Sequence, residues 1–66
     1  MIIETMVGID DYTLLVYRCA DKMYRFSIAN ENGNTYTCNS SFPTLSSAKF
    51  MGVSAIERAN MDRQNQ

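Results

Sequence analysis

The chain has 66 residues, of which 45% are hydrophobic, and its seven acidic and six basic side chains give a formal net charge of -1. One small domain is expected, because a chain of this length buries only about 60% of the surface that it exposes when unfolded. The sequence pI of about 5.0 argues against a general nucleic-acid binder, which needs a concentrated positive surface.

Absence of histidine removes the commonest general base and the commonest zinc ligand. We therefore expect neither an enzyme nor a bound cofactor. No apolar run approaches the ~20 residues that a membrane-spanning helix needs, so no membrane partner is expected. The first residues lack the basic segment of a signal peptide, which favours a cytoplasmic location with reduced thiols.

The first forty residues have the pattern of β-strands. Four segments are rich in β-branched or aromatic residues or alternate in polarity, and turn residues separate them. These predicted strands cover 2–7, 12–19, 23–30 and 34–40.

The last hairpin can close in two ways around the Asn-Gly pair at 32–33. A two-residue loop would pair Ile28 with Thr37 and mix polar with apolar side chains on both faces. A three-residue loop over 31–33, with its glycine in the left-handed conformation, pairs Ile28 with Tyr36 instead. We predict the three-residue loop, because it makes one face apolar and the other polar.

The two cysteines fall on strands that are not neighbours. Cys19 ends the second predicted strand and Cys38 lies on the fourth, with the third strand between them. Two strand spacings amount to ~9.5 Å, which exceeds the ~7 Å limit between the Cα atoms of a disulfide. We expect two separate thiols.

After Pro43 the spacing of apolar residues changes to that of a helix. Thr44 is suited to cap a helix that begins at Leu45. A stripe of small and apolar residues follows at helical spacing: Leu45, Ala48, Gly52, Ala55, Ile56 and Ala59. Glycine inside a helix costs ~1 kcal/mol relative to alanine, so Gly52 indicates close packing on the sheet.

These elements predict an α+β protein, ββββα, in which an antiparallel four-stranded meander has one face closed by a helix over 44–60. A single domain is expected over 1–60. The polar tail over 61–66 is expected to fray.

The second strand is apolar on both sides, with Leu14 and Val16 on one face and Leu15 and Tyr17 on the other. One helix covers one face of a sheet, and the pattern leaves open which face of this strand is buried. Partial exposure of single apolar side chains is one outcome. The other is an interface that supplements the small core.

Two helix residues also favour an interface, because Phe50 and Val53 are apolar but lie off the predicted buried stripe. We therefore take Leu14, Val16, Phe50 and Val53 as candidate interface residues. The expected function is a non-enzymatic protein-interaction module that forms a homodimer, with another protein as a further partner.

Charged residues offer two weaker sites. Arg18, Lys22 and Arg25 are a candidate nucleic-acid patch, with a solvated sheet face as the alternative. The carboxylates suit turns better than metal ligation, so no metal is expected: these are Glu4, Asp10, Asp11 and Asp21.

Four segments carry a family resemblance: 29–33, 40–42, 45–48 and 52–56. Together they resemble the YegP-like family of small bacterial domains, over 24–60. The resemblance implies a β-meander followed by a packed helix, and it implies no activity. The chain departs from that family in its long strands before Met23 and in having one copy of the repeat.

A second resemblance is to antitoxins of the HicB type, in which a sheet is also followed by a helix. Those proteins mask a toxin and usually add a DNA-binding part that this chain lacks. The resemblance provides the alternative function, a nucleic-acid-binding accessory or antitoxin-like regulatory protein.

Overall fold

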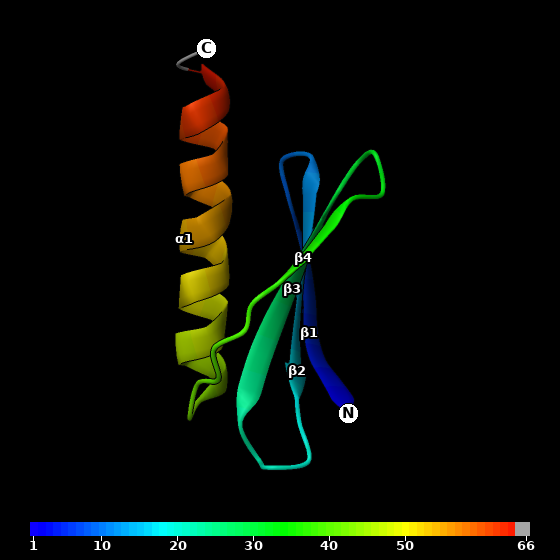
Figure 1. Cartoon of the computed structure of the whole chain (residues 1–66), viewed down its shortest axis with the longest axis vertical. Coiled ribbons are helices and arrows are strands. Elements are labelled where there is room, and N and C mark those ends of the chain that lie inside the picture. Colours follow the sequence, from blue (N-terminus) through cyan, green and yellow to red (C-terminus); the bar gives the residue numbers. More distant parts are fainter. Residues whose placement is uncertain (65–66) are drawn as a thin grey trace.

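The computed structural model describes residues 1–64, with side chains for residues 1–62. Within them, four strands form one antiparallel sheet in the order β1-β2-β3-β4, and one helix lies against a single face of that sheet (Figure 1). The predicted α+β meander with a C-terminal helix is confirmed. Its elements are β1 (Ile2–Ile9), β2 (Tyr12–Arg18), β3 (Tyr24–Asn30), β4 (Thr35–Thr37) and α1 (Leu45–Gln64).

Two strands differ in length from the prediction. β1 continues to Ile9, because the β1–β2 turn needs only two residues and Asp10 takes a φ of 54°. β4 ends at Thr37; beyond it the Cys38 N–H still bonds to β3, and an isolated bridge pairs Tyr24 with Phe42.

The helix is longer than predicted. α1 continues to Gln64, beyond the predicted end at residue 60, while residues 65–66 lie outside the described residues. No glycine or proline interrupts this last turn. Asn60 also ties the helix to the β1–β2 turn, because its Nδ2 donates a 2.8 Å hydrogen bond to Asp10 Oδ2.

The β3–β4 hairpin has the predicted three-residue loop. Ile28 pairs with Tyr36, and Gly33 takes a φ of 85°. Asn30 holds the loop together, because its side-chain oxygen accepts hydrogen bonds from the N–H groups of Asn32 and Asn34, at 2.9 and 3.0 Å.

Replacing Gly33 by alanine should destabilise the protein by about 1–2 kcal/mol, because an L-residue is strained in the left-handed conformation. Urea denaturation followed by circular dichroism measures the change. Asn32→Ala is the matched control: its backbone N–H still bonds to Asn30, and a change below ~0.5 kcal/mol is expected. Equal losses in the two variants would contradict the role assigned to Gly33.

The core lies between α1 and the central strands. Leu14 and Val16 of β2 face Ile28 and Phe26 of β3, and all four are buried beneath Ala48 and Ile56 of α1. The prediction that Leu14 and Val16 form an interface is therefore wrong: both are 0% exposed.

The register with β3 explains which face of β2 is buried. β2 is apolar on both sides, but β3 has Phe26 and Ile28 on one side and Arg25 and Ser27 on the other. Arg25 and Ser27 pair with Tyr17 and Leu15, so that face of the sheet is the one left without a helix. The pairing of β2 with β3 therefore determines which face of β2 is buried, which the pattern of β2 alone leaves open.

Close approach of α1 depends on Gly52. A Cβ atom at this position would lie 2.5 Å from Leu14 Cδ1, so no side chain fits between α1 and β2 here. The helix begins as predicted, with the Ser47 N–H donating to Thr44 Oγ1 at 3.1 Å. Thr44 therefore caps the N-terminus of α1.

Both cysteines carry free thiols, as predicted from the strand order. Cys19 follows β2, and Cys38 donates its N–H to the Phe26 carbonyl on the other side of β3. Both side chains are half-buried, and Cys38 packs against the core.

Candidate interaction surface

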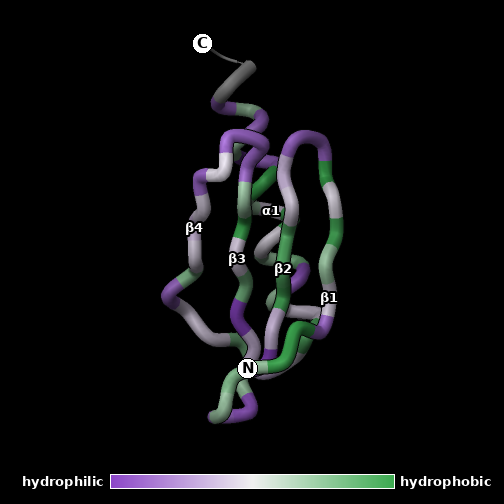
Figure 2. The backbone as a smooth tube through the Cα atoms, turned by 90° about the vertical axis from the view of Figure 1, so that its right-hand side faces the viewer, coloured by the Kyte–Doolittle hydropathy of each residue, from purple (hydrophilic) through white to green (hydrophobic). Residues whose placement is uncertain are grey.

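The face of the sheet opposite α1 is open (Figure 2). Cross-strand pairs place four apolar side chains on its β1–β2 half, since Ile3 lies opposite Tyr17 and Met6 lies opposite Leu15. Ile3 and Met6 are 56% and 66% exposed, and their two partners on β2 are half-buried.

The β3–β4 half of this face is polar. Ser27 and Thr37 lie opposite each other, with their hydroxyl oxygens 3.1 Å apart. Arg25 lies on the same half, and its Nε donates to Ser41 Oγ at 3.0 Å. The apolar part of the open face is therefore confined to the first two strands.

β1 is the most exposed apolar element. Of the eight large hydrophobic side chains exposed in the described part of the chain, four lie within the first six residues. We call these four the β1 surface: Met1, Ile2, Ile3 and Met6. Ile3 and Met6 lie on the open face, and Ile2, opposite Arg18, projects from the other. β1 pairs only with β2, so its other edge presents unpaired backbone groups.

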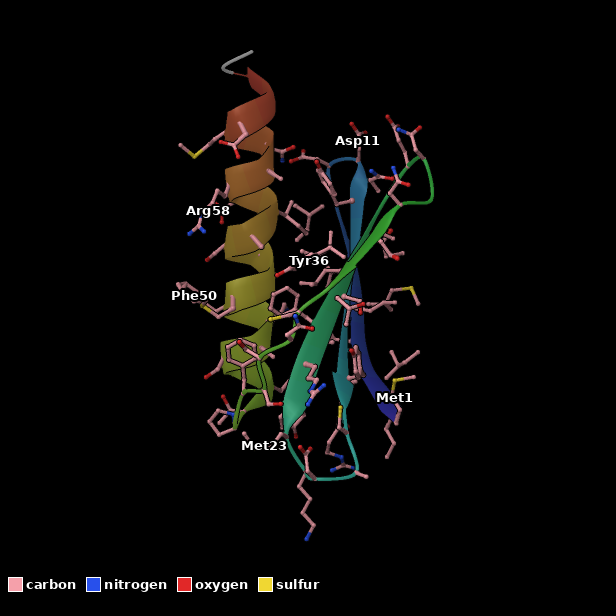
Figure 3. All side chains as sticks on the ribbon, in the orientation of Figure 1. Met1, Asp11, Met23, Tyr36, Phe50 and Arg58 are labelled. Carbon is pink, nitrogen blue, oxygen red and sulfur yellow. The ribbon has the colours of Figure 1, made fainter. Side chains whose placement is uncertain are left out.

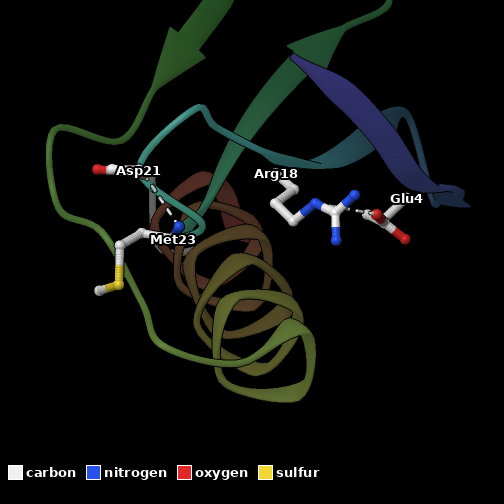
Figure 4. A network of polar contacts seen from close by, with 4 residues as sticks. All are labelled: Glu4, Arg18, Asp21 and Met23. Carbon is white, nitrogen blue, oxygen red and sulfur yellow. Dashed lines mark hydrogen bonds and ion pairs between the residues drawn. The ribbon is translucent and has the colours of Figure 1, made fainter.

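The charge on β1 is neutralised within the chain. A register shift between Ile3 and Thr5 makes Glu4 the extra residue of a bulge, and Glu4 Oε1 lies 3.8 Å from Arg18 Nε (Figure 4). From Thr5 to Ile9 the pairing with β2 is regular and the strand carries no charged residue. This segment lacks the edge charges that usually oppose pairing with another chain.

The remaining predicted interface residues lie on α1 and do not meet the β1 surface. Phe50 is exposed and points away from the sheet (Figure 3). Val53 is half-buried and packs against the core, so it offers less exposed surface than Phe50. Sequence reasoning also missed Ile3 and Met6. The predicted meander contained a signal for these two residues, because the first strand of a meander lies at an edge of the sheet and has a neighbour on one side only.

The three predicted nucleic-acid contacts do not form one patch. Arg18 lies opposite Tyr24, whereas Arg25 lies opposite Tyr17, so the two arginines project from opposite faces of the sheet. Lys22 occupies the β2–β3 turn with a φ of 66°. Arg18 and Lys22 line one hollow beside this turn, whereas Arg25 lies on the other face of the sheet.

Two of the candidate metal-ligating carboxylates serve turns. Asp21 Oδ1 accepts a 3.0 Å hydrogen bond from the Met23 N–H (Figure 4), and Asp10 accepts from Asn60. Among the described residues, no three acidic or cysteine side chains are grouped so that they could hold a metal ion.

A groove lies between the C-terminal half of α1 and the β3–β4 side of the sheet. It has a volume of about 380 Å³ and is mainly apolar. Its walls include Ile28 and Tyr36 from the sheet and Ala55 and Ala59 from the helix. Small helix residues leave this space beside the sheet.

The fold and surfaces thus define a small α+β domain with an exposed apolar edge strand and an open groove beside its helix. Comparison with protein-family models, with curated proteins and with solved structures gave no match for this chain. The resemblance to the YegP-like family therefore stays a prediction. Within residues 1–64, no helix has the length and apolar character needed to cross a membrane.

Proposed function

We propose that this protein is a non-enzymatic protein-interaction module that forms a homodimer by pairing the β1 edges of two copies. The observation that carries the proposal is the concentration of exposed apolar side chains in the β1 surface. Large exposed apolar patches on small domains commonly mark interaction sites. The lack of histidine in the sequence supports a role other than catalysis.

A second copy of β1 fits this edge better than an unrelated strand because of symmetry. Two identical edges pair antiparallel about a two-fold axis, which is the commonest arrangement in homo-oligomers. The regular segment from Thr5 to Ile9 provides the backbone groups, and it brings no like charges together. The bulge at Glu4 limits the pairing to this segment.

The surface needed is available on the β1–β2 half of the sheet. A specific interface at the small end of the usual range buries about 600 Å² on each partner, which is roughly one-eighth of the 4634 Å² that the chain exposes. Ile3, Met6, Leu15 and Tyr17 form a continuous face beside the paired edges. Pairing of the two edges sets these faces side by side in one continuous sheet, so Ile3 and Met6 of the two copies lie next to the seam.

We further propose that the dimer works in a reducing compartment such as the cytoplasm. The two free, half-buried thiols support this location. The alternative function, a nucleic-acid-binding accessory or antitoxin-like regulator, has less support, because Arg25 lies on the opposite face of the sheet from Arg18 and the three cations do not form one patch.

The proposal predicts a mass of twice 7.5 kDa in light scattering at tens of micromolar protein. Met6→Lys should return the protein to the monomer, because it places a charge on the edge that must pair. Circular dichroism should show the same fold, since Met6 is 66% exposed.

Met61→Lys is the matched control for charge and residue type. Met61 is also exposed but lies on α1, away from the β1 surface. We expect this variant to remain dimeric. A monomeric mass for the unsubstituted chain, or equal weakening by both lysines, would contradict dimerisation through β1.

A further inference from the structure

The groove between α1 and β4 is separate from the β1 surface, because β1 and β4 are the opposite edges of the sheet. Its volume of about 380 Å³ falls within the range of small binding pockets. Six residues make up its apolar and aromatic walls: Tyr12, Ile28, Tyr36, Ala55, Ile56 and Ala59. Tyr36 is 58% exposed, so the groove is open along β4.

The backbone of β4 offers hydrogen bonds along this opening. The Asn30 N–H donates to the Asn34 carbonyl and the Cys38 N–H donates to the Phe26 carbonyl, which fixes the alternation along β4. Tyr36 therefore bonds toward β3, while Thr35 and Thr37 direct their N–H and C=O groups away from it. Two donors and two acceptors lie at the spacing that the backbone of another extended strand matches.

We propose that this groove binds an extended segment of another protein, which adds as a fifth strand antiparallel to β4. Strand addition of this kind obtains affinity from backbone hydrogen bonds and specificity from alternate side chains. The residue opposite Tyr36 would share its face of the sheet. Its side chain would enter the space between Tyr36 and Ala55, so this residue is apolar.

Charge at one end of the groove defines a second position of the segment. Asp62 lines the end next to the β3–β4 hairpin and makes no hydrogen bond or ion pair with the other described residues. Arg58 extends from the outer rim away from the sheet (Figure 3). An antiparallel segment runs toward this hairpin, so the residue two positions after the apolar one reaches Asp62 and is lysine or arginine.

The test is selection of a random octapeptide library, displayed on phage, against the full chain carrying Met6→Lys. This variant keeps the groove free of any effect of self-association, so failure here is distinguishable from failure of the dimer. We expect enrichment of peptides with an apolar residue followed two positions later by lysine or arginine. A parallel selection uses the same chain with Thr35→Pro added. Absence of enrichment relative to that selection would overturn the proposal.

The enriched peptide is then synthesised and its binding measured by nuclear magnetic resonance. The amide hydrogens of Thr35 and Thr37 should exchange more slowly in the complex, because they gain partners. Thr35→Pro removes one outward N–H at a sheet edge that tolerates proline, and binding should weaken about tenfold. Thr35→Ala keeps that N–H and should bind like the parent.

Two helix variants test the side-chain contacts. Ala55→Gln should block binding by filling the groove, while Met61→Gln on the exposed face of α1 should leave it unchanged. Asp62→Asn should weaken binding about 2- to 5-fold, and Arg58→Gln should not weaken it. Binding that leaves Thr35 and Thr37 unprotected, or that ignores Ala55→Gln, would overturn strand addition at this groove.

Discussion

Leu14→Ala is expected to lower the free energy of unfolding by about 2–5 kcal/mol. Leu14 is 0% exposed and contacts both its neighbour on β3 and the underside of α1. A domain of this length has a total stability of roughly 3–10 kcal/mol. The substitution should therefore leave a large unfolded fraction at 25 °C, measurable by urea denaturation and by loss of the cooperative thermal transition.

The adjacent residue provides a matched control. Leu15 is on the same strand but faces the open side of the sheet and is half-buried. Leu15→Ala should cost less than about 1.5 kcal/mol, because little of its contact is with the core. A Leu14→Ala variant that keeps its stability and changes only its mass in solution would restore the interface role predicted from the sequence.

Gly52→Ala is expected to destabilise the protein by about 1–3 kcal/mol, which is the usual cost of overpacking a core. In an ordinary helix the same change would stabilise by ~1 kcal/mol. The sign reverses here because the new Cβ would lie 2.5 Å from Leu14 Cδ1 and 3.1 Å from Cδ2. Leu14 is fully enclosed, so it moves aside only by displacing other core side chains.

Two comparisons isolate the contact. Gly8→Ala should be neutral or slightly stabilising, because no atom lies within 4 Å of a Cβ at that position. In a Leu14→Ala background, measured in stabilising sulfate, Gly52→Ala should raise stability, since its methyl group then fills part of the cavity. A gain in stability from Gly52→Ala alone would show that α1 does not depend on this close approach.

Local features were predictable because they depend on neighbours in the sequence. Gly33 and the polarity of the two flanking strands fixed the hairpin register, and Thr44 marked the start of α1. The end of the helix was less predictable. The polar residues after Asn60 suggested that the helix ends at residue 60, whereas α1 continues to Gln64. Asn60 itself bonds to Asp10, fifty residues earlier in the chain, and this contact could not be read from the local sequence.

Exposed apolar side chains were predicted, but two of the residues chosen for them, Leu14 and Val16, were wrong. An apolar excess that one helix cannot cover was evident from β2, yet Leu14 and Val16 turned out to be the covered pair. The exposed pair on β2, Leu15 and Tyr17, joins Ile3 and Met6 on the open face. Identifying that face required the pairing of β2 with β3, which no single strand contains.

The length and composition of this protein determined that it has one small core and a near-neutral charge, and the local patterns determined the order of its elements. Only the tertiary structure decided which side of β2 lies under α1 and which apolar residues remain at the surface. Hairpin loops and helix caps depend on neighbouring residues, whereas burial depends on strands paired across the sheet and on a helix that follows all four of them.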